Sequence, residues 1–357
     1  MNQEKFIFKN SEGISYTSFW EAPSNIALIK YWGKKGNQIP SNPSISFLLS
    51  KCFTRTKINF SPINSKKDPW FTFKLDGKIK LDFYKKIETF LENILPYVPS
   101  LKMHNLIIDS SNSFPHSSGI ASSASSMAAI ALCITDWERQ INSEMTEEIF
   151  KIKASFLARL GSGSAARSIY GPIASWGKTS HLKESSDRYA IPFKQKIDKI
   201  FDGFCNTIII IDEAKKEISS TEGHRLMNDH PFAKKRFYQA NQNFFEIKNS
   251  LATGDIEKFI QIVESEALTL HALMMTSSPP YKLFKPETIE IIELIKNYRE
   301  NSKTPLCFTL DAGPNIHFLY PKAFRKDVLD FIDNEIIKIF PSIKFIHDEV
   351  GNGPKKI

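Results

Sequence analysis

The sequence predicts an α+β fold in two domains. At 357 residues the chain is long for a single hydrophobic core, since cores stop growing at roughly 250–300 residues. Its first half mixes predicted strands with a few helices. The second half shows a strand, several helices, two strands, a helix and a strand, an order typical of α+β domains. A polar segment at residues 178–188 separates the halves, so we expect an N-terminal domain over 1–190 and a C-terminal domain over 191–357.

The first half contains three short strand patterns and one early helix. Residues 54–60 and 70–75 alternate apolar and polar side chains, which predicts a β-hairpin. Apolar residues at helical spacing predict a helix over 80–94, and a further strand is expected over 106–110.

The second half contains the longest helical patterns. A run of isoleucines predicts a buried strand over 206–212, and the turn "AGP" joins two strands over 306–310 and 316–320. The other expected elements are helices over 232–251, 256–275, 286–299 and 323–339, and a strand over 343–347.

Composition limits the kinds of partner. The net charge of +8 permits an anionic partner, but the basic residues are scattered among acids, which favours a small anionic ligand and not nucleic acid. No apolar run approaches the roughly 18 residues that span a bilayer, and the N-terminus lacks a secretory pattern. We expect a soluble, cytoplasmic protein without a membrane partner.

The cysteines and histidines show no metal-binding spacing. The four isolated cysteines lie in or beside apolar segments and are expected to be buried thiols in a reducing compartment. His224 and His230 are six residues apart, which is no recognised ligand spacing, so we expect no histidine metal site.

Serines cluster where an alanine-rich helix is expected to begin, near Ser122. The start of a helix offers unpaired N–H groups and the positive end of its dipole to an anion, so residues 113–134 suit phosphate binding. A capped, closely packed core helix is the alternative.

A second candidate segment is "ARLGSGSAARSIYG" at residues 158–171. A helix that begins near Thr146 is expected to end at Gly161, and a short helix then carries Arg167 within one turn of Ser164. With Ser162, these groups suit a carboxylate or a phosphate. An arginine in a surface salt bridge is the alternative.

Two lysines flank an aromatic pair at the end of the strand expected over 25–31, where Lys30 interrupts the apolar face and Lys34 follows Gly33. Lys30 and Lys34, with the hydroxyl of Tyr31 between them, could bind a polyanion, or they could be incidental surface lysines. Asp311 lies where a strand ends at a turn, so its carboxylate either serves in chemistry or accepts a hydrogen bond in an Asx turn.

Four segments together resemble the mevalonate diphosphate decarboxylase family. They are "APSNIALIKYWGK" at 22–34, "PHSSGIASSAS" at 115–125, "GSGSAARS" at 161–168 and "DAGPN" at 311–315. The resemblance covers about residues 20 to 320 in the same order. That family belongs to the superfamily of galactokinase, homoserine kinase, mevalonate kinase and phosphomevalonate kinase. The resemblance implies a two-domain α+β fold with an active-site cleft between the domains.

The resemblance also implies a reaction. MgATP phosphorylates the 3-hydroxyl of mevalonate 5-diphosphate, and the product loses phosphate and carbon dioxide to give isopentenyl diphosphate. By this analogy Asp311 faces the 3-hydroxyl, Arg167 holds the substrate carboxylate, and Lys30 lies near Asp311 or the transferred phosphoryl group. Homodimers are common in the family, so a homodimer is expected.

The remaining site residues are also taken from the resemblance. The substrate-binding set is expected to be Tyr31, Lys34, Ser162, Ser164, Arg167, Ser219 and Ser220. The ATP phosphates are expected at Ser118, Gly119, Ser122 and Ser123, with Mg²⁺ as the accompanying ion and no metal ligand assigned to the protein.

One departure from the family pattern bears on the substrate. Thr221 follows the Ser219-Ser220 pair where some family members carry a basic residue. Mevalonate 5-phosphate decarboxylase and mevalonate 3-kinase are therefore alternatives on the same scaffold. A basic RNA-binding protein is a remote alternative, which predicts clustered basic and aromatic residues.

Overall fold

Two large β-sheets with separate helical layers, and a small sheet of β2 (Lys34–Lys35) and β3 (Ile39–Pro40), form the described part of the chain. The computed structural model describes residue 7 and residues 13–63, 69–115, 122–213 and 218–357. Within those ranges the larger sheet has eight strands, in the order β14-β1-β4-β7-β5-β6, with β8 beside β4 and β9 beside β8. Its strands are β1 (Tyr16–Ile29), β4 (Ser44–Pro62), β5 (Phe71–Leu75), β6 (Lys78–Ile79), β7 (His104–Asn112), β8 (Ile173–Trp176), β9 (Ile191–Pro192) and β14 (Lys355–Lys356).

The predicted hairpin in this sheet is wrong. Residues 54–60 and 70–75 do lie in strands β4 and β5, but β7 lies between them. It pairs antiparallel with β4 and parallel with β5. The helix α1 (Tyr84–Ile94) crosses over between β6 and β7, which makes the parallel pairing possible. Alternation fixes which face a side chain occupies, but it does not fix the neighbouring strand.

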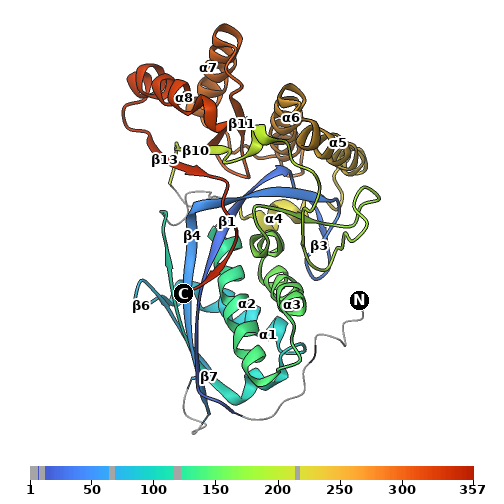
Figure 1. The fold of residues 1–357 in the computed structure, drawn as a ribbon, viewed down its shortest axis with the longest axis vertical. Helices are drawn as coiled ribbons and strands as arrows, with labels where there is room; N and C mark the ends of the chain where they lie inside the picture. Colours follow the sequence, from blue (N-terminus) through green and yellow to red (C-terminus); the bar gives the residue numbers. More distant parts are fainter. Residues whose placement is uncertain (1–6, 8–12, 64–68, 116–121, 214–217) are drawn as a thin grey trace.

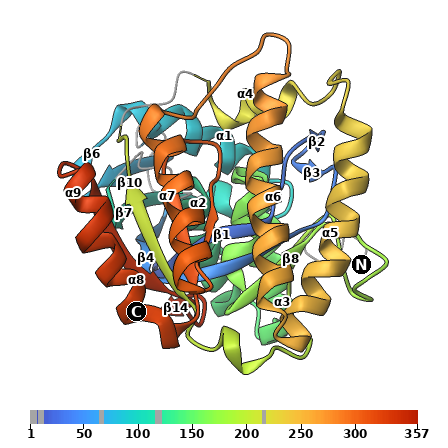
Figure 2. The same ribbon diagram turned by 90° about the horizontal axis from the view of Figure 1, so that it is seen from above.

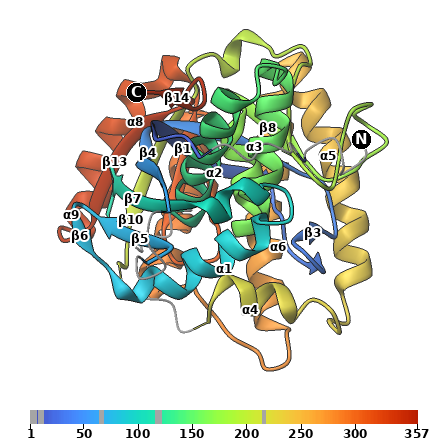
Figure 3. The same ribbon diagram turned by 90° about the horizontal axis from the view of Figure 1, so that it is seen from below.

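Three helices cover the larger sheet. They are α1, α2 (Ser122–Ile141) and α3 (Glu147–Gly161), and Figure 3 shows them in the view from below. The alanines of α2 are buried between sheet and α3, where small side chains permit close packing. Thr146 caps α3 through its side chain, which confirms the helix expected to begin near this residue, and the short 3₁₀ helix η4 (Gly163–Ile169) follows at once.

The second sheet confirms the strands expected in the second half. Its order is β11-β12-β10-β13, and all its pairs are antiparallel. The strands are β10 (Cys205–Ile210), β11 (Cys307–Thr309), β12 (Ile316–Tyr320) and β13 (Lys344–Glu349). The hairpin around Asp311 is therefore confirmed.

Helices α5 (Ala233–Thr253), α6 (Ile256–Met275) and α7 (Pro286–Ser302) match the expected ranges closely. Figure 2 shows them side by side, and Figure 1 shows them at the opposite end of the molecule from α1. The helix expected over 323–339 is divided into a 3₁₀ turn, α8 (Arg325–Phe331), a π-helical segment (Ile332–Ile336) and α9 (Ile337–Ile339). The short helix α4 (Ser220–Arg225) precedes α5.

Strands β1 and β4 connect the two halves. One end of each packs against α2, and the other end packs against α5, α6 and β10 through residues such as Ile26, Phe47 and Phe244. Two register shifts interrupt the β1–β4 ladder, between Pro23 and Asn25 and between Ala27 and Ile29. Such bulges commonly re-aim side chains beside active sites. Figure 1 shows that both strands, which belong to the larger sheet, extend toward the helices of the second half.

The C-terminal strand returns to the first half of the chain. Strand β14 pairs with β1, and Lys356 is opposite Trp20. The expected division at residue 190 stays a prediction. All four cysteines are buried and free, as expected. Among the described residues, no helix is long and apolar enough to cross a membrane.

Candidate active site

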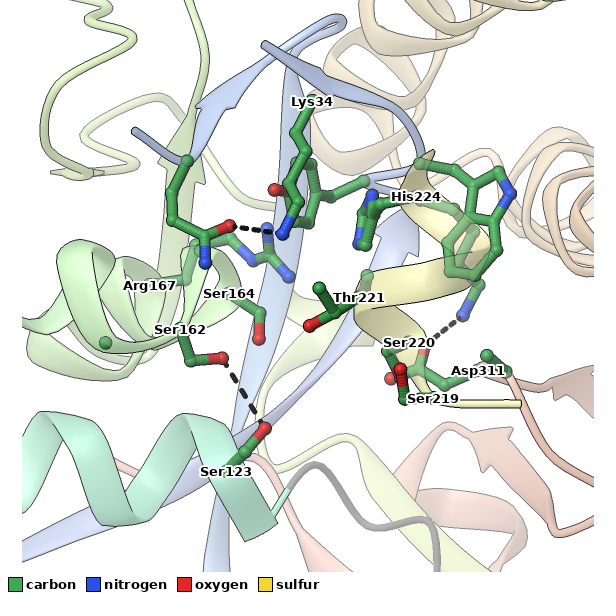
Figure 4. A pocket seen from close by; sticks show the side chains of 18 of the residues that line it. Lys34, Ser123, Ser162, Ser164, Arg167, Ser219, Ser220, Thr221, His224 and Asp311 are labelled. Atoms are coloured by element: carbon green, nitrogen blue, oxygen red, sulfur yellow. Dashed lines mark hydrogen bonds and ion pairs between the residues drawn. The ribbon is translucent and has the colours of Figure 1, made fainter. Parts of the chain in front are cut away.

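A cleft of about 410 Å³ collects residues from both halves of the chain (Figure 4). It contains the following predicted site residues: Lys30, Tyr31, Lys34, Ser122, Ser123, Ser162, Ser164, Arg167, Ser219, Ser220 and Asp311. Ser118 and Gly119 lie outside the described residues. The tertiary structure thus brings together segments that are up to 281 residues apart in the chain.

Lys30 and Asp311 form an ion pair in the cleft. The ammonium group of Lys30 donates to Oδ1 of Asp311 at 2.9 Å. The Lys30 side chain is 2% exposed, whereas that of Asp311 is 31% exposed, so the carboxylate remains open to a ligand. Burial by itself raises the pKa of Asp311, but the charge and hydrogen bond of Lys30 outweigh it and hold this pKa below its usual value. The Asp311 carboxylate is therefore ionised at neutral pH.

The Asx-turn interpretation of Asp311 is not what the structure shows. The N–H of Gly313 donates to the backbone carbonyl of Asp311 at 2.8 Å, and the carboxylate bonds to Lys30. His271 also contacts that carbonyl, through Nε2 at 3.0 Å. The turn is held by backbone contacts, which leaves the side chain to face the cleft.

A second, fully buried ion pair holds the backbone of Lys30. The carboxylate of Glu266 accepts the backbone N–H of Lys30 at 2.8 Å and both terminal nitrogens of Arg236 at 2.6 Å. Arg236 in turn donates to the carbonyl of Lys30 at 3.1 Å. Both backbone polar groups of Lys30 are thus fixed just beyond the end of β1.

Arg167 is a buried cation held by neutral groups. Its guanidinium donates to the hydroxyl of Ser46 at 2.6 Å, to that of Ser44 at 2.7 Å and to Oδ1 of Asn25 at 3.3 Å. The residue is 3% exposed, and among the described residues no carboxylate lies within 4.0 Å of it. Burial lowers the pKa of Arg167 to about 10, while Asp311 and Tyr31 act in the opposite direction, so it stays charged at neutral pH. The surface salt-bridge alternative is wrong.

Tyr31 and Lys34 follow Lys30 along the same wall. The hydroxyl of Tyr31 is buried without a hydrogen-bond partner among the described residues, and burial raises its pKa. Its ring contacts Trp176 edge-on, with 4.7 Å between ring centroids. The ammonium of Lys34 donates to Oε1 of Gln38 at 3.1 Å, and partial burial lowers its pKa. Burial of the hydroxyl and of Lys34 disfavours the interpretation of an incidental surface segment.

Serines from three segments face the cleft. Ser162 lies between α3 and η4, and its hydroxyl is 3.4 Å from that of Ser123 on α2. Ser164 accepts the side-chain amide of Asn25 on its carbonyl at 3.3 Å. A Cβ atom on Gly163 would lie 2.8 Å from the Tyr31 ring, so only glycine permits this approach. The segment that carries Ser162 and Ser164 therefore packs closely against Tyr31.

Helix α4 adds a wall from the second half of the chain. Ser219 caps it by accepting the N–H of Glu222 at 3.2 Å, and Ser220 and Thr221 line the cleft. His224 also lines the cleft, although its spacing from His230 was considered above only as that of a metal ligand. Its signal was its position four residues after Ser220, on the same face of a helix.

Other residues of the cleft were not predicted. They are Ala27, Trp32, Gln38, Lys86, Gly161, Gly163, Thr221, Leu270 and Ala312. Glu266 was missed as well, although a carboxylate in the apolar stripe of an expected helix is a signal for a buried polar contact.

The charges of the cleft indicate its ligand. Among the described residues that line it, the cations are Lys30, Lys34, Lys86 and Arg167, and Asp311 is the one carboxylate. This excess of positive charge, with several hydroxyl donors, suits a small molecule that carries more than one negative group. Fold and cleft together define a two-domain α+β enzyme that acts on a small polyanion.

Comparisons with known proteins identify the family. Residues 22–190 match the diphosphomevalonate decarboxylase-like N-terminal domain, and residues 206–353 match the mevalonate 5-diphosphate decarboxylase C-terminal domain. The diphosphomevalonate decarboxylase of Candida albicans is 29% identical over 329 residues, which cover 89% of this chain and 88% of the relative. That of Saccharomyces cerevisiae is 28% identical over 341 residues, which cover 92% and 83%.

Solved structures agree. The mevalonate diphosphate decarboxylase of Staphylococcus aureus has a TM-score of 0.82 at 29% identity, over 96% of this chain and 98% of that chain. A structure of MDDEF in complex with MVAPP, AMPPCP and magnesium has a TM-score of 0.82 at 26% identity, over 96% and 99%. The chain belongs to the mevalonate diphosphate decarboxylase family. Membership in an enzyme family replaces the remote alternative of a basic RNA-binding protein.

Proposed function

We propose that this protein catalyses the ATP-dependent decarboxylation of mevalonate 5-diphosphate to isopentenyl diphosphate, with release of ADP, phosphate and carbon dioxide. Family membership supports the reaction. The observation that carries it is the meeting, in one cleft, of an ionised Asp311 paired with Lys30 and a buried Arg167 without a carboxylate partner among the described residues. Phosphoryl transfer needs the first group, and a carboxylate substrate suits the second.

Asp311 is assigned to the 3-hydroxyl of the substrate. An ionised carboxylate that is still 31% exposed can accept the hydroxyl proton as the oxygen attacks the phosphoryl group. The adjacent ammonium of Lys30 keeps the carboxylate ionised and provides positive charge near the transferred group. The tertiary alcohol is thereby converted into a phosphate ester, which is a far better leaving group.

Arg167 is assigned to the substrate carboxylate. Its fork of N–H donors matches the geometry of a carboxylate, and the bonds to Ser44 and Ser46 fix its orientation. In the second step the carboxylate leaves as carbon dioxide. The electrons of the broken carbon–carbon bond form the new double bond, and the bond from carbon 3 to the phosphate oxygen breaks.

The 5-diphosphate is assigned to the other donors of the cleft. These are the Tyr31 hydroxyl, the Lys34 ammonium and the hydroxyls of Ser162, Ser164, Ser219 and Ser220. The unpartnered hydroxyl of Tyr31 supports this assignment, because a buried donor without a partner costs free energy until a ligand accepts its hydrogen bond.

The described residues also fit a nucleotide. Ser122 and Ser123, at the first residues of α2, line the cleft beside Ser162, where the positive end of the helix dipole favours phosphate. Bound MgATP supplies the transferable phosphoryl group. Because the one carboxylate among the described cleft residues is paired with Lys30, these residues fit a Mg²⁺ carried by the nucleotide phosphates and water.

The experiment supplies purified protein and MgATP with mevalonate, mevalonate 5-phosphate or mevalonate 5-diphosphate, and measures ADP and carbon dioxide together. Equal amounts of both products from the diphosphate alone are expected. ADP without carbon dioxide would assign a 3-kinase, and turnover of the monophosphate would assign the other decarboxylase. Thr221, which lines the cleft where some relatives carry a basic residue, makes that comparison necessary.

Assembly and location are separate predictions. We propose a homodimer, which sedimentation of the purified protein tests, and a cytoplasmic location, which cell fractionation tests. A monomeric sedimentation coefficient at micromolar concentration would exclude the dimer.

A further inference from the structure

His224 has one ring nitrogen whose role is fixed by the backbone. The N–H of Gly33 points to Nδ1 of His224 at 3.0 Å. A backbone N–H can only donate, so Nδ1 accepts with its lone pair and the proton of a neutral ring lies on Nε2. This contact joins helix α4 to the segment that carries Lys30, Tyr31 and Lys34.

The ring is buried between aromatic side chains and cannot easily gain a second proton. Its centroid lies 4.2 Å from that of Tyr31 and 4.6 Å from that of Trp32, and the residue is 7% exposed. Burial, with the charges of Lys34 and Arg167 acting in the same direction, lowers the pKa of His224 to about 3. At neutral pH the ring is therefore an uncharged donor through Nε2.

Helix α4 packs closely against Trp32, and this close packing holds the His224 ring beside the Trp32 ring. A Cβ atom on Gly223 would come within 2.6 Å of the Trp32 ring and of the Tyr281 hydroxyl. Glycine at residue 223 therefore permits an approach that any other residue would prevent. The His224 ring is held on both flanks and through Nδ1.

The second nitrogen remains available to a ligand. Among the described residues Nε2 of His224 has no hydrogen-bond partner and is not enclosed, and His224 lines the cleft (Figure 4). Tyr31, whose ring packs against that of His224 and whose hydroxyl is unpartnered among the described residues, and Lys34, whose charge acts on the His224 ring, line the same cleft. These are the groups assigned above to the 5-diphosphate. Three donors of this kind thus line the cleft.

We propose that His224 is a substrate-binding residue whose Nε2–H donates to an oxygen of the terminal phosphate of the 5-diphosphate. The assignment rests on the proposed function for the identity of the ligand. It adds a donor on α4 where Thr221 supplies no basic group, and it makes the terminal phosphate a determinant of specificity. Because the donor is neutral, its contribution does not depend on titration of the ring between pH 6 and 9.

The test compares three replacements at this one position. His224→Gln provides an oxygen that can accept from Gly33 and an N–H that can donate. His224→Glu keeps the acceptor, and its ionised form, which Lys34 and Arg167 favour against the effect of burial, has no donor. His224→Met provides neither. His230→Gln is the matched control, because its ring is satisfied by Leu273 and Phe232 away from the cleft.

The expected loss is that of one hydrogen bond to a charged group, roughly tenfold to a hundredfold in affinity. His224→Met and His224→Glu should raise KM for mevalonate 5-diphosphate by that factor with KM for ATP and kcat changed less than about twofold. His224→Gln should recover most of the affinity. KM for mevalonate 5-phosphate should change little in every variant. Melting temperatures establish that each variant is folded.

Several results would overturn the assignment. If His224→Gln and His224→Glu behave alike, His224 serves only to hold Gly33. If KM for the monophosphate rises as much as that for the diphosphate, the terminal phosphate is not the acceptor.

Binding of inorganic pyrophosphate, followed by calorimetry, separates this inference from the proposed reaction. Loss of pyrophosphate affinity in His224→Met, with an inactive wild-type protein, would retain the donor and reject the reaction. Unchanged pyrophosphate affinity with an active wild-type protein would reject the donor and retain the reaction.

Discussion

Replacing Asp311 with asparagine removes a negative charge that lies 2.9 Å from the ammonium of Lys30. The change preserves the shape of the side chain, so its effect on turnover isolates the charge and the basicity of the carboxylate. Asp311 raises the pKa of Lys30 against the opposing effect of burial, and its loss therefore also favours the neutral form of that lysine. Both effects remove charge from the place where phosphoryl transfer is proposed.

The magnitude follows from the proposed role. General-base catalysis by a positioned side chain contributes roughly 10²- to 10⁴-fold, so kcat for coupled ADP and carbon dioxide release should fall by about that factor. Removing one member of a fully buried pair costs about 3–5 kcal/mol, but the Asp311 side chain is 31% exposed, so the loss of unfolding free energy should be smaller. ATP affinity should be nearly unchanged.

Asp212→Asn is a suitable control, because Asp212 is paired with Lys285 at 3.1 Å outside the cleft. Single-turnover measurements with saturating mevalonate 5-diphosphate would separate chemistry from product release. If Asp311→Asn retained kcat within about threefold of the wild type, a role for this carboxylate in proton transfer would be untenable. A parallel loss in Asp212→Asn would indicate a general effect of removing a Lys–Asp pair.

Three other outcomes are expected. Arg167→Met should lower kcat/KM for the diphosphate roughly 10- to 100-fold, because hydrogen bonds to charged groups contribute about 1.5–3 kcal/mol. Unchanged steady-state kinetics would show that Arg167 does not bind the substrate carboxylate. Glu138→Gln should lower the free energy of unfolding in urea by about 3–5 kcal/mol, since it takes the carboxylate from the buried ammonium of Lys153, and Glu138→Leu with Lys153→Met should recover most of that loss. Carbon-13 NMR of labelled aspartates, assigned with Asp311→Asn, should show Asp311 titrating at a lower pH than an ordinary aspartate, because Lys30 lowers its pKa. The contribution of this ionised group to stability is thus present at neutral pH and lost as the pH falls through the folded-state pKa. A midpoint near pH 6 would contradict that electrostatic account.

Local sequence patterns predicted most of the elements. Helix α6 occupies the expected residues 256–275, and β12 occupies 316–320, because long apolar periodicity and strong turn residues act within a few residues of one another. The prediction of a hairpin between β4 and β5 was wrong because β7, which follows α1 in the chain, pairs with both strands and lies between them. Periodicity carries no information on that neighbour.

The site was predictable as residue types but not as a geometry. A family resemblance in four segments named Asp311, Arg167 and Lys30, and the cleft contains all three. The residues that hold them were missed, including Glu266 and Arg236 at the backbone of Lys30. Such supporting contacts join helices to a strand end, so they have no signature at short sequence separation.

The sequence by itself determined the α+β class, the order of most helices and strands, and the chemical character of an anion-binding site. Only the tertiary structure decided that Lys30 pairs with Asp311 and that Arg167 is buried among serines. It also decided that Nδ1 of His224 accepts a hydrogen bond from the backbone N–H of Gly33. The physical reason is distance along the chain. Helix and strand periodicity arise from local backbone geometry, whereas burial, pKa and tautomer depend on groups that folding brings together from nearly three hundred residues away.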